Sequence, residues 1–286
     1  MATRPVPLRK SNVINVASVP HRSPFRYPGG KTWLVPRIRQ WLRSLKPKPI
    51  ELAEPFAGGA IVGLSALFES LVERLVLIEK DKDVGSVWEV VINGQAQKLA
   101  DAIVNFELSL DTVKSMLDRQ PVTIFDRAFT TILRNRVQRG GILAPGASLI
   151  KKGENGKGLA SRWYPVTLRN RIEAILKNRQ KIAFIPGDGI EFIRYNGHRL
   201  DTAFFIDPPY TVAGRRLYTH SEIDHEALFE AVSHIRGDFL MTYDNAKEIK
   251  HLAVKFGFQT ELIPMKNTHH EIMNELLVGR DLRWLH

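Results

Sequence analysis

The residues of this sequence that could do chemistry most directly form a short run, Asp207-Pro208-Pro209-Tyr210, which follows the apolar residues Ala203–Ile206. Proline lacks a backbone N–H and fixes its own φ angle, so this run would end a buried strand on stiff backbone. Open parallel sheets bind ligands at the carboxyl ends of their strands, where the carboxylate could accept hydrogen bonds and the ring could stack. The same residues also describe an ordinary strand exit, because Asp before Pro favours a turn.

A second run, Glu54-Pro55-Phe56-Ala57-Gly58-Gly59-Ala60, follows the apolar residues 50–53 and opens a helix. Glycines at a strand-to-helix turn let the backbone approach a ligand closely. The run is not a phosphate-binding loop, since it has neither a Gly-Lys-Ser/Thr ending nor a full G-x-G-x-x-G pattern. Its acid, Glu54, suits a cationic ligand instead. Glu79 ends the next apolar run, where an acid can accept hydrogen bonds from ribose hydroxyls.

To lie together, these turns must follow neighbouring strands of one sheet. Short apolar runs predict strands at 50–53, 75–78, 181–185, 203–206, 239–242, 259–264 and 275–278. Apolar residues near a 3.6-residue period predict helices at 32–45, 60–70, 99–117, 124–137, 168–178, 224–235 and 246–256, with a short one after Gly189. Strand and helix alternate early and late in the chain. This alternation predicts an α/β fold with a mostly parallel sheet and helices on both faces.

Charge is concentrated in two basic segments. The net charge is +11, and residues 1–50 carry eleven Lys and Arg and no acid. Residues 127–179 carry twelve Lys and Arg against two acids. They belong to a stretch, about 86–178, that is rich in helix, poor in strand and contains the loop-like residues Gly140–Leu159. Basic segments that interrupt a mildly acidic body indicate a protein that binds a polyanion, although they can also serve solubility alone.

The composition excludes several kinds of protein. There are no cysteines, so disulfides, Cys-ligated zinc and iron–sulfur clusters are ruled out. No run of eighteen apolar residues appears, and the N-terminal residues lack the apolar region of a signal peptide. The cluster His269-His270-Glu271 lacks the i, i+4 histidine spacing of a helical zinc site, so we expect no metal.

Taken together, these runs resemble the motifs of the Dam-like family of DNA adenine methyltransferases. The similarity covers about residues 25 to 280 and rests on FRYPGGK (25–31), AEPFAGGAIVGL (53–64), VLIEKDKD (76–83), NRVQRGGIL (135–143), IPGDGIEFI (185–193) and DPPY (207–210). Tyr27-Pro28 replaces the commoner Trp-Ala of the first motif, and Ala60 replaces the last glycine of the second. The recognition segment lacks the tyrosine-rich form of enzymes that read GATC, so that target is not implied.

The resemblance implies a Rossmann-like, mostly parallel seven-stranded methyltransferase sheet with an inserted helical DNA-recognition subdomain. It divides the chain into a flexible basic arm (1–22), a catalytic domain that binds S-adenosylmethionine (23–85 and 179–286) and a target-recognition subdomain (86–178). The cofactor-binding residues that it implies are Tyr27, Lys31, Glu54, Phe56, Gly58, Gly59, Glu79, Asp188 and Asp207. The catalytic residues that it implies, acting on the amino group of a flipped-out adenine, are Asp207, Pro208, Pro209 and Tyr210.

Double-stranded DNA is the implied partner, contacted by Arg134, Asn135, Arg136, Arg139, Lys151, Lys152 and Lys157. Of these, we expect Arg136 or Arg139 to read a base. We expect a cytoplasmic monomer that associates with the nucleoid through DNA, and a companion restriction endonuclease is left open. Two other functions also remain open. The same four residues serve methylation of the cytosine amino group, and a DNA-binding regulator without activity could keep the fold.

Overall fold

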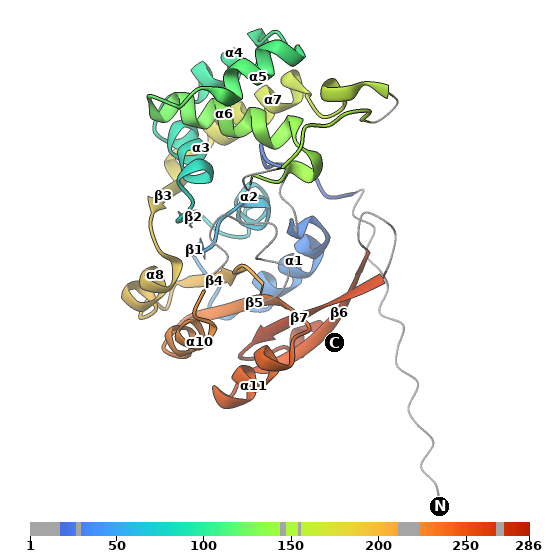
Figure 1. Ribbon diagram of the computed structural model, residues 1–286. Helices are drawn as coiled ribbons and strands as arrows, with labels where there is room; N and C mark the ends of the chain where they lie inside the picture. The colour runs from blue at the N-terminus through green and yellow to red at the C-terminus, as the bar shows by residue number, and fades with distance from the viewer. Residues whose placement is uncertain (1–17, 27–29, 144–146, 154–155, 211–222, 267–271) are drawn as a thin grey trace, which may run out of the picture.

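The computed structural model describes residues 18–26, 30–143, 147–153, 156–210, 223–266 and 272–286. Its centre is a seven-stranded sheet in the order β3-β2-β1-β4-β5-β7-β6 (Figure 1). The strands from β3 to β5 run parallel, and β7 runs antiparallel to both of its neighbours. The predicted fold class, a Rossmann-like and mostly parallel seven-stranded sheet, is therefore confirmed.

Each strand predicted from an apolar run is present. The strands are β1 (Glu51–Glu54), β2 (Arg74–Glu79), β3 (Ile182–Pro186), β4 (Thr202–Ile206), β5 (Asp238–Asp244), β6 (Gln259–Lys266) and β7 (Ile272–Gly279). The central strands β1 and β4 are buried along their whole length, as expected of strands covered on both faces. Because β1, β2, β3 and β4 are parallel, the turns after them meet at one edge of the sheet.

Successive residues of the strands pack into two different cores. Leu52, Leu75 and Phe205 belong to one core, with the helices α1 (Val35–Ser44) and α2 (Ile61–Phe68). Their neighbours in sequence, including Ala53, Val76 and Phe204, belong to the other. That second core contains the helices α8 (Gly189–Asn196), α10 (His225–Ser233) and α11 (Lys247–Lys255). This alternation follows from the two-residue period of a strand.

The chain between β2 and β3 is helical. It holds α3 (Lys82–Ile92), α4 (Ala96–Asn105), α5 (Leu110–Asp118), α6 (Ile124–Val137) and α7 (Pro165–Lys177). Figure 1 shows α4 to α7 as a layer at the top of the molecule, away from α8, α10 and α11. Helix α3 packs on α6 and on β3, so it joins this layer to the sheet. The predicted boundary between residues 85 and 86 falls inside α3.

In this region one helix was missed and one helix prediction was wrong. Helix α3 was not predicted, although Asp81 caps it by accepting hydrogen bonds from the N–H groups of Asp83 and Val84. The single helix expected at 99–117 is two helices, α4 and α5. The second begins at a capping box in which Ser109 and Thr112 satisfy each other's backbone N–H groups.

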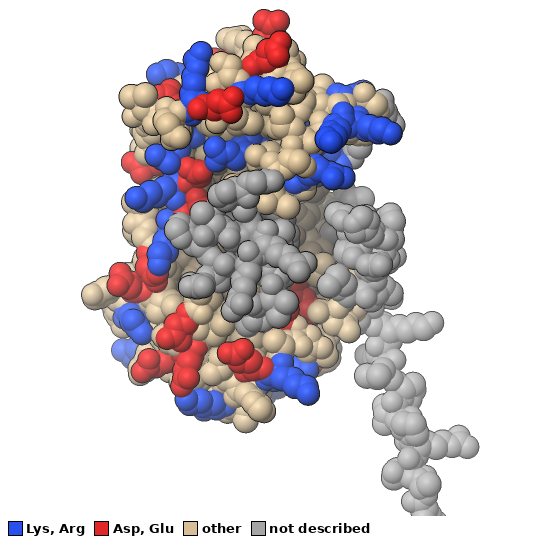
Figure 2. All heavy atoms as spheres, in the orientation of Figure 1, with Lys and Arg blue, Asp and Glu red and all other residues tan. Residues whose placement is uncertain are grey.

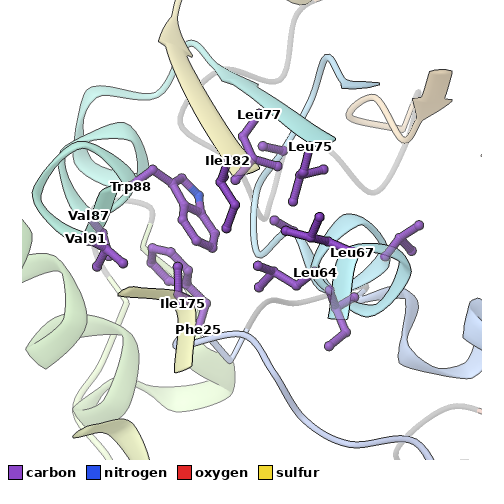
Figure 3. Packing of buried hydrophobic residues seen from close by; sticks show 14 of the residues in the cluster. Phe25, Leu64, Leu67, Leu75, Leu77, Val87, Trp88, Val91, Ile175 and Ile182 are labelled. Atoms are coloured by element: carbon purple, nitrogen blue, oxygen red, sulfur yellow. The ribbon is translucent and has the colours of Figure 1, made fainter. Parts of the chain in front are cut away.

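The described part of the predicted N-terminal arm, residues 18–22, packs against the body of the protein. Val19 is buried, and Arg22 forms an ion pair with Glu69. Phe25 packs on Trp88, with ring centroids 5.8 Å apart, and Figure 3 shows both rings beside Ile175 and Ile182. The prediction of a flexible arm is therefore wrong at Val19 and Arg22, whereas Ser18, Pro20 and His21 are exposed. Residues 1–17 lie outside the described ranges.

The η2 turn (Lys31–Leu34) leads into α1 and carries a buried lysine, Lys31, into the interior. None of the helices in the described ranges combines the length and apolar character that crossing a bilayer requires.

Candidate active site

A cavity of about 550 Å³ lies at the carboxyl ends of β1, β2 and β4. The sequence-predicted site residues that line it are Lys31, Glu54, Phe56, Gly58, Gly59, Glu79, Asp188, Asp207 and Pro209. The structure thus brings together residues that lie up to 178 positions apart in the chain, because parallel strands deliver their following turns to one edge. Tyr27 lies outside the described residues.

The glycine turn between β1 and α2 is held from two sides. The N–H of Gly58 donates to Oε2 of Glu79 at 2.8 Å, and its carbonyl accepts from Nε1 of Trp88 at 2.9 Å. Gly58 has a φ of 46°, which favours glycine, and Ala60 has a left-handed conformation with a φ of 48°. Ala60 stands where the resembled motif has its last glycine. At this departure from the motif, an alanine therefore adopts a backbone conformation that favours glycine.

Glu54 ends β1 as a buried carboxyl group. It accepts a hydrogen bond from the N–H of Gly63, in the first turn of α2. Burial raises the pKa of Glu54 to about 8, the Gly63 bond acts against this rise, and the nearby Asp207 carboxylate adds to it. At neutral pH this position is therefore mostly protonated, and a cation in the cavity would favour its ionised form.

Glu79 ends β2 and ties two backbone segments together. Besides Gly58, it accepts from the N–H of Asp81 at 2.9 Å. Burial raises its pKa to about 7, against the effect of these backbone bonds. Each carboxyl oxygen has a second lone pair, so Glu79 can still accept from the hydroxyls of a ribose. The residues present therefore fit a cofactor that combines a ribose with a positive charge.

Asp207 follows β4 and is fixed through one of its two oxygens. Oδ1 lies 2.9 Å from Nζ of Lys31 and accepts from Oγ1 of Thr242, on β5, at 2.7 Å. Among the described residues, no hydrogen bond to Oδ2 is found. Asp207 also lines the cavity, so this carboxylate has a fixed orientation and an acceptor oxygen left for a ligand.

Lys31 is buried between two carboxyl groups. Its Nζ lies 2.9 Å from Asp207 and 3.1 Å from Oε1 of Glu275, on β7. Burial raises the pKa of Glu275 to about 7, Lys31 opposes this rise, and Asp207 adds to it. Lys31 was predicted to bind the cofactor. In this structure its ammonium group contacts carboxyl groups of the protein, so we assign it the positioning of Asp207.

Tyr210 lies over a buried aromatic support. Its ring stacks on that of Tyr243 at 6.2 Å and 28°, and Nζ of Lys31 lies 4.9 Å from its centroid. The Tyr243 hydroxyl lies 3.1 Å from Nδ1 of His225, and burial raises the pKa of this tyrosine well above its usual value. Within the described ranges, no hydrogen-bond partner is found for the Tyr210 hydroxyl. The position of Tyr210 thus depends on ring packing.

Asp188 lines the cavity and also caps α8. Its Oδ1 accepts from the N–H groups of Ile190 and Glu191, and its Oδ2 lies 3.0 Å from Nζ of Lys80. Burial acts to raise the pKa of Asp188, but the Lys80 and backbone bonds outweigh it and lower the pKa below its usual value. This carboxylate is ionised at neutral pH and is fixed at the cavity wall.

Two of the predicted DNA contacts are buried. The Asn135 amide bonds to the backbone of Arg26 in both directions and also donates to the Gly141 carbonyl. Arg136 donates to the Pro24 carbonyl, and burial, with Arg171 and Arg26 nearby, lowers its pKa to about 9. Both side chains hold the N-terminal segment on α6. We therefore drop Asn135 and Arg136 from the predicted DNA surface.

The other predicted DNA contacts lie at or near the surface. Arg139, Lys151, Lys152 and Lys157 are exposed, and Arg134 is partly exposed and paired with Asp83 at 3.0 Å. Figure 2 shows basic side chains gathered over the helical part of the molecule, at the upper right of the view. Contact of these residues with DNA stays a prediction.

Sequence reasoning missed four residues that support the site: Trp88, Thr242, Tyr243 and Glu275. Thr242 is the last residue of the strand predicted at 239–242, Tyr243 lies just beyond it, and Glu275 is the first residue of the strand predicted at 275–278. The observed strands β5 and β7 extend past these bounds and include all three residues. A charged residue inside a strand that is otherwise buried was the available signal for Glu275, since such a residue needs a partner.

No protein-family model matches this chain, and no curated protein sequence matches it. Solved structures with a similar fold include a protein assigned as an RNA methyltransferase from Pyrococcus horikoshii, at 11% identity and a TM-score of 0.41, over 89% of this chain and 84% of that one. The rRNA methyltransferase AviRa from Streptomyces viridochromogenes has 10% identity and a TM-score of 0.40, over 87% and 84%. A precorrin-6y C5,15-methyltransferase from Geobacter metallireducens has 10% identity and a TM-score of 0.35, over 85% and 84%. Similarity this low carries no conclusion about activity or substrate.

Proposed function

We propose that this protein transfers a methyl group from S-adenosylmethionine to the exocyclic amino group of an adenine that is flipped out of duplex DNA. The observation that carries the proposal is the arrangement at Asp207. Lys31 and Thr242 fix one oxygen of this carboxylate, and the other oxygen is left for a ligand beside a cavity rich in acids. The Asp-Pro-Pro-Tyr run at this place and its motif resemblance support the same assignment.

Methylation of an adenine amino group requires hydrogen-bond acceptors that the protein holds in fixed positions. The adenine amino nitrogen is a weak nucleophile, because its lone pair is delocalised into the ring. Hydrogen bonds from its two hydrogens to Oδ2 of Asp207 and to the Pro208 carbonyl favour a pyramidal nitrogen whose lone pair is available. Pro208 and Pro209 hold their carbonyls on backbone with a fixed φ angle. Such positioning and electrostatic preorganisation account for most of the acceleration that we expect.

The target base must leave the duplex to reach Asp207. Base flipping costs a few kcal/mol, and stacking of the flipped base on an aromatic ring returns about 1–3 kcal/mol. Tyr210 offers such a ring, and Tyr243 supports it from beneath. Replacing Tyr210 with Phe should therefore matter less than replacing it with Ala.

The carboxylates and the glycine turn that line the cavity are suited to binding S-adenosylmethionine. We assign Glu79 to the ribose hydroxyls, Asp188 to the adenine side of the cofactor and the glycine turn 58–59 to close backbone contact. Bound there, the cofactor would supply a methyl group on a positively charged sulfur. The acids Glu54 and Asp207 favour that charge, because each ionised carboxylate in a buried place is stabilised by a nearby cation.

DNA would approach across the helical part of the molecule. The exposed residues Arg139, Lys151, Lys152 and Lys157 are suited to phosphate contacts, which give affinity and make it depend on salt. Arg139 is the remaining candidate for reading a base, since a bidentate arginine–guanine contact is worth about 1–3 kcal/mol.

The test is to incubate the protein with unmethylated duplex DNA of mixed sequence and methyl-deuterated S-adenosylmethionine, and to analyse the digested nucleosides by mass spectrometry. We expect deuterated N6-methyladenine from the wild type and, after the same short incubation, about a hundredfold to a thousandfold less from Asp207→Ala. Deuterated N4-methylcytosine would select the cytosine alternative. Binding of DNA without any labelled base would select the non-catalytic alternative.

A further inference from the structure

Lys31 joins two carboxyl groups that come from distant parts of the chain. Its Nζ lies 2.9 Å from Oδ1 of Asp207, after β4, and 3.1 Å from Oε1 of Glu275, on β7. Asp207 faces the cavity, whereas Glu275 is only 5% exposed and is absent from the cavity lining. The three groups form a row of close charged contacts that leads from the cavity into the sheet. The contact of Lys31 with Oε1 of Glu275 is an ion pair, because this oxygen has no hydrogen bond of good geometry among the described residues.

The three groups Asp207, Lys31 and Glu275 carry one more negative than positive charge when all are ionised, so they can take up one proton. Two carboxyl groups share one ammonium group, and the Asp207 carboxylate also acts to raise the pKa of a third carboxyl group, Glu54. Lys31 contacts Glu275 from η2, and the Asp207 carboxylate acts on it electrostatically from the end of β4. Asp244 on β5 is its partner in register, and Ile263 on β6 is apolar. In these surroundings burial raises the pKa of Glu275 to about 7, with Lys31 opposing and Asp207 adding to this rise.

We propose that Glu275 is the final acceptor of the proton that the target amino group loses, and that Lys31 passes this proton to it from Asp207. This inference rests on the proposed function. In this role Glu275 does not touch the substrate. It is a positioning and proton-accepting residue that acts through Lys31.

The step balances as follows. The amino nitrogen uses its lone pair to bond the methyl carbon, and the electrons of the carbon–sulfur bond stay on sulfur, which becomes a neutral thioether. The nitrogen now carries a positive charge and two hydrogens, and it gives one proton to Asp207. The Asp207 carboxyl group turns about its Cβ–Cγ bond and brings the protonated oxygen to Nζ of Lys31. Lys31 then releases one proton to Glu275 and takes up the proton from Asp207. Asp207 ends as a carboxylate, Lys31 as an ammonium group and Glu275 as a neutral acid.

The experiment compares Glu275→Gln with the wild type in single-turnover methylation between pH 5.5 and 9. We expect the wild-type rate to rise with pH through about 7 and then level off, because Glu275 must be ionised to accept the proton. In Glu275→Gln the rate should fall about tenfold to a hundredfold at pH 8, and the rise near pH 7 should be lost. Glu275→Asp should restore part of the rate and of the pH dependence.

Glu261→Gln is the matched control, because Glu261 lies on the neighbouring strand β6 and acts electrostatically on Arg37. Its pH profile should match that of the wild type. A Glu275→Gln profile that keeps its rise near pH 7, at a rate within twofold of the wild type, would overturn the inference alone. A wild type that methylates no DNA would instead overturn the proposed function.

A readout without catalysis uses 13C-labelled glutamate carboxyl groups. The resonance that vanishes in Glu275→Gln should titrate near pH 7 in the wild type, and its pKa should fall in Asp207→Asn, because the neighbouring negative charge is gone. If Glu275→Gln fails to fold, Glu275→Asp identifies the resonance by its loss from the glutamate spectrum. A Glu275 pKa that is the same in Asp207→Asn would show that the two carboxyl groups are not coupled, and would overturn the inference.

Discussion

The two ends of strand β1 carry buried glutamates in opposite situations. Glu51, at the amino end, lies 2.6 Å from Arg199 and 3.2 Å from Arg74, and accepts from Thr202. Glu54, at the carboxyl end, accepts from a backbone N–H and lies under the influence of another acid, Asp207. They are only three positions apart, yet one carboxylate is neutralised by cations and the other has its pKa raised to about 8.

The two ends of β4 repeat the contrast. Asp201, just before the strand, lies 3.6 Å from Arg74 and 3.7 Å from Arg199. Asp207, just after it, shares Lys31 with Glu275. At the amino ends, arginines balance the acids, and the arrangement stabilises the fold. At the carboxyl ends, acids outnumber cations among the described residues of the cavity wall, and that imbalance suits a positively charged ligand.

The largest expected effect is on the rate of methyl transfer, which should depend on Asp207 and not on Asp201. Asp207→Ala should lower single-turnover methyl transfer by about a hundredfold to a thousandfold, because it removes a preorganised acceptor that acts mainly in the transition state. Asp201→Ala should leave the rate within about twofold, since its partners lie at the far end of the strand. Quenched-flow measurement with labelled cofactor gives both rates. Asp207→Ala within a few-fold of wild type would refute the mechanism.

The next effect is on stability at pH 7. Glu51→Gln should lower the free energy of unfolding by about 1–3 kcal/mol, because two arginines lose a charged acceptor; their partial exposure keeps the loss at this level. Glu54→Gln should instead leave the free energy of unfolding unchanged or raise it, because Gln keeps an oxygen for the Gly63 N–H and, unlike Glu54, takes up no proton on folding at this pH. Urea unfolding measures both. An equal loss of unfolding free energy in the two variants would contradict the distinction between the amino and carboxyl ends of β1.

The pH dependence of stability sharpens the same comparison. The folded-state pKa of Glu54 is raised from 4.5 to about 8, so the folded protein holds this proton more tightly than the unfolded chain. Stability from this group is fully present below about pH 4.5 and is lost as pH rises toward 8, by at most about 1.4 kcal/mol per pH unit. Glu54→Gln should flatten this decline in urea midpoints measured from pH 4.5 to 8, and Glu51→Gln should not. A decline as steep in Glu54→Gln as in the wild type would contradict the assignment.

The smallest effect concerns the glycine turn that follows Glu54. Ala60→Gly should raise the free energy of unfolding by up to about 1 kcal/mol, because glycine relieves the left-handed backbone while gaining freedom in the unfolded chain. Gly58→Ala, the reverse change at a similar φ, should lower it by about 1–2 kcal/mol. Thermal unfolding of both variants is the measurement. A loss of stability in Ala60→Gly would mean that its methyl group packs more favourably than the backbone strain costs.

The strands could be predicted from sequence because each is a short apolar run bounded by charges or turns, as with Ala203–Ile206 before Asp207. Helix α3 was missed because its starting signal is a single residue, Asp81. Helices α4 and α5 were merged because apolar residues continue through Phe106 and Leu108, and the Ser109 capping box was overlooked.

The cavity wall could be predicted because parallel strands place their carboxyl ends side by side. The groups around Asp207 could not be predicted. Thr242 bonds to it directly and Glu275 contacts its partner Lys31, and both lie on strands whose register is set only by the folded sheet. The burial of Asn135 and Arg136 could not be predicted from the sequence either. Each bonds to backbone more than 100 residues away, at Arg26 and Pro24, so local sequence gives no sign of it.

The most direct test of the central claim is calorimetric titration of S-adenosylmethionine into the wild type, Glu79→Ala and Glu51→Gln at pH 7.5. The account predicts binding by the wild type in the micromolar range, at least tenfold weaker binding by Glu79→Ala at the cavity, and unchanged binding by Glu51→Gln at the opposite end of the sheet. Absence of binding heat in the wild type at millimolar cofactor, or equal affinity in Glu79→Ala, would contradict the claim that the carboxyl ends of the strands form a cofactor site.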